Sequence, residues 1–276
     1  MYGLVAAALV AYTAIALIFK AAASRTRPDQ LVIVALATVT LIAAVLMVVR
    51  GEWGGTWSGG ALALISGALF YFASTLRARA LATTPASLVF AVTNLDLVVS
   101  GAIVLFIPAF GQPVTPWHVL AILTAGGAIV LGARVRDVER IGGATFGSLA
   151  LLAAAATGFV LYAHFFPGAL LFFILLDHLA GVLLNGRVLR DVRRAELSWG
   201  IPLGLCMFIG FWCLLQALTM AGDQTTLVLL VLSLKTPLIA LLSAVTFGER
   251  ATREKLAAVA LATVALLLWE IGSGSV

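Results

Sequence analysis

Apolar residues fill most of the chain in long runs, which short polar or glycine- and proline-containing stretches interrupt. A helix that crosses a bilayer needs about 20 mostly apolar residues. The pattern predicts ten such helices, at residues 3–20, 31–49, 58–77, 85–107, 116–133, 143–163, 168–186, 198–219, 224–246 and 254–271. The uncharged run from Ile141 to Leu176 is too long for one helix, and Pro167-Gly168 is its expected break. We therefore expect an all-α integral membrane protein.

Composition agrees with this pattern and excludes two other classes of protein. Of the 276 residues, 62% are hydrophobic and 11% are charged, about half the charged share of a soluble domain. The same figures exclude an intrinsically disordered chain. The net charge of +5 does not indicate nucleic-acid binding, because no basic run interleaved with aromatic residues lies outside the apolar segments. The first run lacks a positively charged start, so we expect a spanning helix there rather than a cleaved signal peptide.

Basic residues predict how the helices are oriented. Of the seventeen Lys and Arg residues, Arg50 alone lies in an even-numbered loop and Lys235 lies inside the ninth helix. The other fifteen lie in odd-numbered loops: Lys20, Arg25, Arg27, Arg77, Arg79, Arg134, Arg136, Arg140, Arg187, Arg190, Arg193, Arg194, Arg250, Arg253 and Lys255. Cytoplasmic loops carry an excess of Lys and Arg, so the odd loops are predicted to be cytoplasmic and both termini outside. We expect the chain to be a multi-pass protein of the plasma membrane, specifically of a prokaryotic inner membrane.

The chain repeats itself at an offset of 137 residues. The matched positions are Ala80-Leu81 with Ala217-Leu218, Phe110-Gly111 with Phe247-Gly248, and Thr115 with Thr252. Each half has five helices, an odd number, so the second half enters the membrane from the opposite side. This predicts two inverted five-helix repeats, residues 1–137 and 138–276, which are the usual basis for alternating access around a midplane site. A duplicated structural bundle without transport is the alternative.

These repeats resemble the EamA-like branch of the drug/metabolite transporter superfamily. The second half carries Ala217-Leu218, Pro237 within the ninth helix, and the turn Phe247–Arg250. The first half keeps Ala80-Leu81 and Phe110-Gly111 but has Gln112 where the family usually has Glu. The resemblance implies a ten-helix secondary transporter whose third, fourth, eighth and ninth helices line a central cavity. By that analogy the candidate cavity residues are Tyr71, Phe72, Phe90, Phe208, Trp212 and Gln216.

Lys235 is the most informative ionisable residue at membrane depth. A charge at the bilayer centre costs about 2.5–3.5 kcal/mol on insertion scales, so its presence needs a reason. Lys235 lies near the middle of the predicted helix 224–246, out of snorkelling reach of either end, and Pro237 follows it. We expect it to bind an anionic group of a substrate. A permanent pair with a carboxylate is the alternative.

Asp96 is the natural partner of Lys235, because it lies near the middle of the predicted helix 85–107 and the two halves face each other. An incoming carboxylate or proton would then compete for one member of the pair. Thr93, Asn94 and Ser100 lie within one or two helical turns of Asp96 and are candidates for hydrogen bonds to a substrate. A permanent structural pair remains the alternative for Asp96.

Asp177 and His178 lie in the middle of the predicted seventh helix. Adjacent helical residues point about 100° apart, so only one of the two can face a central cavity. Together with Asp96 they are the candidates for a coupling proton, because His titrates near neutral pH and a desolvated Asp can titrate there as well. An interhelical hydrogen bond is the alternative. The three scattered histidines support no metal site.

Two further features have structural interpretations. Gly126-Gly127 and the pair Gly200 and Gly204 place small residues where helices can approach closely. Glu249, in the predicted turn before the tenth helix, is expected to pair with Arg250 or Arg253 or to cap that helix.

The sequence therefore predicts a secondary transporter rather than an enzyme. It should export a small polar or amphipathic metabolite, such as an amino acid or an organic anion, by alternating access. No Walker motif is present, so nucleotide is not the expected driver, and no cofactor is expected. The expected partners are the substrate and membrane lipids, with the chain acting as a monomer or a homodimer. A flippase for a lipid-linked phosphate intermediate, a membrane enzyme and a non-transporting scaffold are the alternatives.

Overall fold

Seven helices in the described part of the computed structural model are long and apolar enough to cross a membrane. Three shorter apolar helices, at Ala86–Ser100, Pro116–Leu131 and Lys235–Phe247, occupy the positions of the predicted fourth, fifth and ninth segments. All ten predicted segments therefore contain helix, in the predicted order. The chain is a multi-pass bundle of membrane helices, as its hydropathy pattern predicts.

The structure describes residues 1–52, 54–105, 107, 114–133, 142–166, 169–221, 231–232, 234–250 and 252–274. The predicted break at Pro167-Gly168, the repeat motif at Phe110-Gly111 and the arginines of the fifth loop lie outside these ranges. The α-helices are α1 (Tyr2–Ala23), α2 (Pro28–Arg50), α3 (Trp57–Thr83), α4 (Ala86–Thr93), α5 (Asp96–Leu105), α6 (Pro116–Ala133), α7 (Gly143–Phe165), α8 (Leu170–Asn185), α9 (Arg194–Ala221), α11 (Lys235–Phe247) and α12 (Arg253–Gly274), and a 3₁₀ helix, η2 (Gly186–Asp191), follows α8.

The predicted helix 85–107 is divided, and the predicted helix 224–246 contains a turn directly before Lys235. The predicted helix 85–107 is divided at Asn94 and Leu95 into α4 and α5. The helix α11 begins at Lys235, directly after a turn at Leu234, so Lys235 starts a helix instead of lying inside one. Pro237 is the third residue of α11. At that position its missing N–H group removes no hydrogen bond within the helix, so the proline fits a helix start better than the predicted helix interior.

Helix α3 extends further than predicted and contains two arginines that the sequence assigns to a loop. Its N-cap, Thr56, accepts a hydrogen bond from Gly59 N at 3.1 Å, and the helix continues to Thr83 because no helix breaker precedes Pro85. Arg77 and Arg79 are therefore helical residues. Their assignment to the third loop is wrong.

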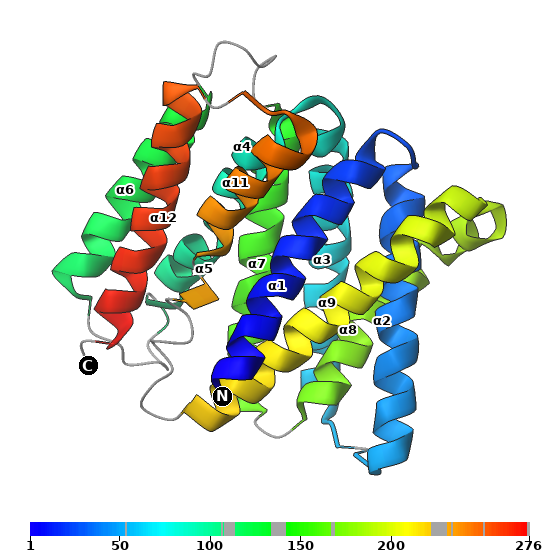
Figure 1. The fold of residues 1–276 in the computed structure, drawn as a ribbon. Coiled ribbons are helices and arrows are strands. Elements are labelled where there is room, and N and C mark those ends of the chain that lie inside the picture. Colours follow the sequence, from blue (N-terminus) through cyan, green and yellow to red (C-terminus); the bar gives the residue numbers. More distant parts are fainter. Residues whose placement is uncertain are drawn as a thin grey trace.

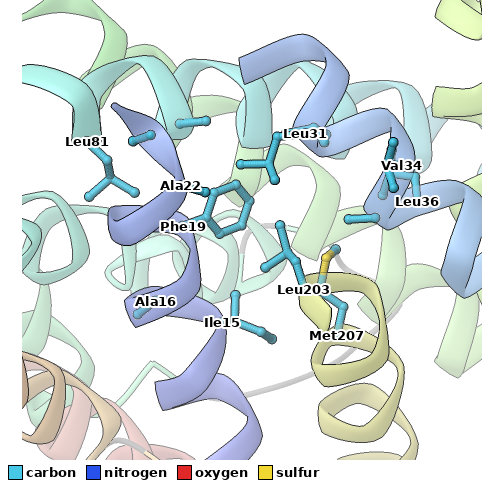
Figure 2. Packing of buried hydrophobic residues seen from close by; sticks show 14 of the residues in the cluster. Ile15, Ala16, Phe19, Ala22, Leu31, Val34, Leu36, Leu81, Leu203 and Met207 are labelled. Atoms are coloured by element: carbon cyan, nitrogen blue, oxygen red, sulfur yellow. The ribbon is translucent and has the colours of Figure 1, made fainter. Parts of the chain in front are cut away.

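The helices form two neighbouring groups with separate hydrophobic cores (Figure 1). One core joins α1, α2, α3, α8 and α9, and Figure 2 shows its interlocking side chains, including Phe19, Leu31 and Leu203. The other core joins α4, α5, α6 and α12 and includes Leu95 and Leu266. Helix α4 contributes to both cores. The start of α1 and the end of α12 lie at one end of the bundle, and the α1–α2 turn lies at the other (Figure 1).

Glycines allow close approach at two helix pairs. A Cβ atom at Gly200 would lie 2.6 Å from Val34, and one at Gly204 would lie 2.5 Å from the carbonyl oxygen of Ala35, so α9 packs tightly on α2 as predicted. At Gly67 a Cβ atom would lie 1.7 Å from the carbonyl oxygen of Asp177, which brings the backbones of α3 and α8 together. Gly126 has open space around it, so the predicted close approach does not occur there.

Replacing Gly67 with Ala should force α3 and α8 apart and lower the thermal unfolding midpoint of the purified protein. Overpacking of this kind costs about 1–3 kcal/mol or more, because a backbone atom cannot rotate away. Gly126→Ala is the matched control and should leave the midpoint unchanged or raise it slightly, because a methyl group fits there and Ala favours the helix. Equal midpoints for Gly67→Ala and the unmodified protein would contradict the close α3–α8 contact.

Candidate functional site

A cavity of about 210 Å³ lies in the middle of the bundle, among α1, α3, α4, α5, α7, α8, α9 and α11. Its wall is mostly aliphatic and aromatic. Four ionisable side chains also line it, from four different helices: Arg77, Asp96, Asp177 and Lys235. The third, fourth, eighth and ninth predicted helices all contribute, as the resemblance implies, and α1, α7 and α8 contribute as well.

Arg77 of α3 is a cavity residue that the sequence interpretation missed. Its guanidinium carbon lies 5.3 Å from the ring centroid of Phe90, a cation–π distance. Its Nε atom is buried and has no hydrogen-bond partner among the described residues. A buried guanidinium N–H without an acceptor is costly, so this group is ready to bind an anionic oxygen.

Asp96 and Lys235 line the same cavity, each at the first residue of its helix, α5 and α11. The charge of Asp96 acts on both Lys235 and Arg77. The Lys235 Nζ atom lies 5.3 Å from the ring centroid of Tyr12 in α1. The predicted proximity of Asp96 and Lys235 is thus present, but Arg77 shares the site and makes it a cluster of two cations and one carboxylate.

A hydrogen bond joins the two places where the helices are interrupted. Asn94 lies at the end of α4, and Thr236 is the second residue of α11. The Asn94 Nδ2 atom donates a hydrogen bond of 3.0 Å to the Thr236 hydroxyl. Both residues are buried. The helix starts that carry Asp96 and Lys235 are therefore held next to each other by an amide–hydroxyl contact between the two halves of the chain. Asn94 itself lines the cavity.

Of the adjacent residues Asp177 and His178, only Asp177 lines the cavity in the described part of the chain, although the two side chains touch, with His178 Nδ1 3.5 Å from Asp177 Oδ2. Asp177 lines the cavity beside Ser66 of α3. His178 packs between the rings of Phe70 and Phe211, with centroids 5.7 Å away in each case. Its Nδ1 atom lies 2.9 Å from the Ile174 carbonyl oxygen, which can only accept, so Nδ1 carries the proton. Asp177 is the member of the pair that a substrate in the cavity can reach.

The other predicted site residues lie outside the cavity wall, as far as the structure describes it. Tyr71 is buried between α3 and α8, where its hydroxyl accepts a hydrogen bond from Asn185 Nδ2 at 2.6 Å. Trp212 stacks on Phe208, with centroids 6.1 Å apart, below the guanidinium of Arg50. Phe72 is exposed, and the remaining three are buried or half-buried in the helix packing: Thr93, Ser100 and Gln216. Of the aromatic candidates, Phe90 alone lines the cavity.

The cavity side of α3 follows a regular spacing that sequence analysis could have found. Ser66, Phe70, Ser74 and Arg77 are separated by four, four and three residues, so they share one face of the helix. The face carries two hydroxyls, a phenyl ring and a charge, whereas the helix as a whole is mostly apolar. This spacing is the signal that would have identified Arg77 as a residue facing the interior of the bundle.

The chemistry of the cavity suits binding better than bond cleavage. In the described part of the chain, no group of three or more His, Cys, Asp or Glu side chains is placed to hold a metal ion. The volume is below the range of about 300–1,000 Å³ for sites of drug-sized ligands, which favours a small molecule. Arg77 and Lys235 are suited to bind an anionic group of a ligand. The aromatic and aliphatic wall is suited to contact an apolar part of the same ligand.

No protein-family model matches the chain, and no curated protein matches it. Solved structures do match. One of them, described as "Crystal structure of protein", has a TM-score of 0.63 and 18% sequence identity, and the match covers 96% of this chain and 94% of the other. At this identity the similarity shows that the two chains share a fold over nearly their whole length. It adds nothing about the ligand.

Proposed function

We propose that this chain is a secondary transporter that carries a small organic anion through the central cavity, with Arg77 and Lys235 as the anion-binding residues. The observation that carries the proposal is the charged cluster of Arg77, Asp96 and Lys235 at membrane depth, in a cavity framed by two helix starts. Ionisable residues inside a membrane are costly, and they are characteristic of substrate and ion pathways. Helices interrupted near the midplane are typical of transporter binding sites, because unwound backbone is tolerated where it lines a cavity.

Ten membrane helices in two inverted repeats, residues 1–137 and 138–276, are part of the proposal. If α7, α8, α9, α11 and α12 correspond to α1, α2, α3, α4–α5 and α6, the main helix contacts should occur twice or lie on the axis, although the smaller α2–α3 and α1–α3 contacts have no counterpart of similar extent between the described residues of α8 and α9 or of α7 and α9. The packing supports this: α1 packs on α9 as α7 packs on α3, and α2 packs on α9 as α8 packs on α3. The pairs α2–α8, α4–α11 and α6–α12 also pack directly, as pairs on the axis should.

This organisation is also why we propose kinship with the EamA-like branch of the drug/metabolite transporters. The basic residues favour a cytoplasmic location for the end of the bundle that holds the α1–α2 turn, with both termini outside. Export across the plasma membrane is the proposed direction. Asp96 and Asp177, which both line the cavity, are the proposed carriers of a coupling proton.

A thermal-stability screen tests the anion site directly. Purified protein would be melted in the presence of organic acids, amino acids, sugar phosphates, lipid phosphates and cationic drugs, beside the variants Lys235→Ala and Arg253→Ala. One anionic class should raise the melting midpoint of the unmodified protein, because a ligand that binds the folded state stabilises it by about 2.7 kcal/mol at 100 times its Kd. Lys235→Ala should lose the shift, whereas Arg253→Ala, which removes an exposed charge on α12, should keep it.

Each outcome of the screen decides between alternatives. Stabilisation by cations to the same extent in the unmodified protein and Lys235→Ala would overturn the anion site. Stabilisation by lipid phosphates alone would favour the flippase. Anion binding without anion-dependent flux in liposomes would contradict transport and favour a sensor or a scaffold.

A further inference from the structure

We propose that Glu249 is a gating residue that closes the α4–α11 end of the transport pathway, by capping a helix of the opposite half of the chain. The inference rests on the proposed transport function, because a gate has meaning only where a substrate passes. Glu249 lies in the connection between α11 and α12. The sequence predicts a local role for it, in a pair with Arg250 or Arg253 or as a cap of the following helix, and the structure contradicts that prediction.

The carboxylate of Glu249 binds the first residues of α4. Its Oε1 atom accepts a hydrogen bond from Ala86 N at 2.5 Å, and Oε2 accepts from Ser87 N at 3.2 Å and from the Ser87 hydroxyl at 2.7 Å. Helix α4 has no side-chain cap of its own, since the preceding residue is Pro85. Glu249 therefore supplies the missing acceptors and a favourable negative charge at the helix N-terminus.

A second side chain secures the adjoining end of α3. The Lys20 Nζ atom, from α1, donates to the carbonyl oxygens of Leu81 and Thr84, each at 2.9 Å. These are carbonyls at the C-terminal end of α3, which have no partners within the helix. Lys20 also interacts electrostatically with Glu249. The short α3–α4 connection is thus bound by one cation and one carboxylate from distant parts of the chain.

The position of these contacts indicates a gate. Helix α4 runs from this end of the bundle to Asn94, and α11 runs back from Lys235 to the same end, beside α4 (Figure 1). Asn94–Thr236 joins the two helices next to the cavity, and Glu249 joins them at the end that holds the α1–α2 turn. Alternating access requires these halves to separate on one side during each cycle. The Glu249 contacts are the ones that must break when this side opens.

Cysteine labelling tests the gate. The reporter is Ile239→Cys, a buried cavity residue one turn after Lys235, in a background in which Cys206 and Cys213 are replaced with Ala. A membrane-impermeant maleimide would be added to inside-out vesicles and to intact cells. Glu249→Gln should raise the labelling rate on one side by about tenfold, the effect of losing a hydrogen bond to a charged group. Glu249→Ala should raise it further, and Ser87→Ala, which removes one of the three bonds from α4 to Glu249, should raise it less.

Asp191→Asn is the matched control, because it removes an exposed carboxylate on η2 and should leave labelling unchanged. Retained elution volume and melting behaviour would show that the Glu249 variants still fold. Equal labelling rates for Glu249→Gln, Glu249→Ala and the parent on both sides would overturn the gate, even if anions bind normally. If labelling rises but no anion stabilises the unmodified protein, the contact is a gate of the bundle while the proposed anion site fails.

Discussion

Arg77→Gln should weaken anion binding strongly while leaving the bundle folded. The Arg77 guanidinium lines the cavity, and its buried Nε–H has no acceptor among the described residues, so an anionic ligand would be its partner. Truncating one member of a buried charge contact costs about 2–5 kcal/mol. We therefore expect the Kd for the best anion of the stability screen to rise at least about thirtyfold, measured by calorimetry or by ligand-dependent melting.

Arg79→Gln is the control, because Arg79 lies two residues further along α3 and its side chain is exposed. It makes the same chemical change outside the cavity and should leave the Kd unchanged. Arg77→Lys should bind with intermediate affinity, because an ammonium keeps the charge and loses the planar, bidentate geometry. An Arg77→Gln variant that binds the anion as tightly as the unmodified protein would show that Lys235 is sufficient.

The membrane fold was largely predictable, and the extent of individual helices was not. Apolar runs set the number and order of the helices, because the bilayer demands about 20 apolar residues from each. Where a helix ends is decided by the next breaker and by tertiary contacts. Helix α3 continues through Arg77 because Pro85 is the first residue after it that stops a helix, and the arginine is accommodated by an internal cavity rather than by the membrane surface.

The interruption at Asn94 shows a second reason why the sequence did not predict the extent of a helix. No proline or glycine lies near it, so the local sequence predicts a continuous helix over residues 85–107. The partner that stabilises the end of α4 is Thr236, which is 142 residues away. A break stabilised by such a distant partner leaves no mark on the local pattern. The same holds for Glu249, whose partners on α4 lie 162 and 163 residues earlier in the chain.

The sequence pointed to cavity residues where a single residue was unusual for its surroundings. Lys235, Asp96 and Asp177 stand out because each is an ionisable residue within an apolar run, and all three line the cavity. Tyr71 and Trp212 were expected in the cavity because the resemblance implies that their helices line it, which does not indicate which face of a helix a ring occupies. Both rings pack against other helices instead. The helical spacing of polar residues on α3 carries information that composition lacks.

Asp96→Asn should separate binding from transport. Asp96 is the carboxylate among the cavity groups whose charge acts on both Arg77 and Lys235, so it competes with an incoming anion for them. Its neutralisation should tighten the Kd for the anion about tenfold, which corresponds to about 1.4 kcal/mol. Release should slow for the same reason, because the carboxylate whose charge acts on both cations is no longer there to replace the anion. We expect the turnover of anion flux in liposomes to fall by at least about tenfold as well.

Tighter binding together with slower flux is what distinguishes a competing carboxylate from a structural one. If Asp96 only stabilised the start of α5, Asn would preserve much of that role, and both the Kd and the turnover would stay near those of the unmodified protein. If Asp96 instead bound a cationic part of the substrate, Asp96→Asn would weaken binding. Glu52→Gln, which removes an exposed carboxylate 3.7 Å from Arg50, should change neither quantity, so any effect common to both variants would come from net charge and not from the cavity.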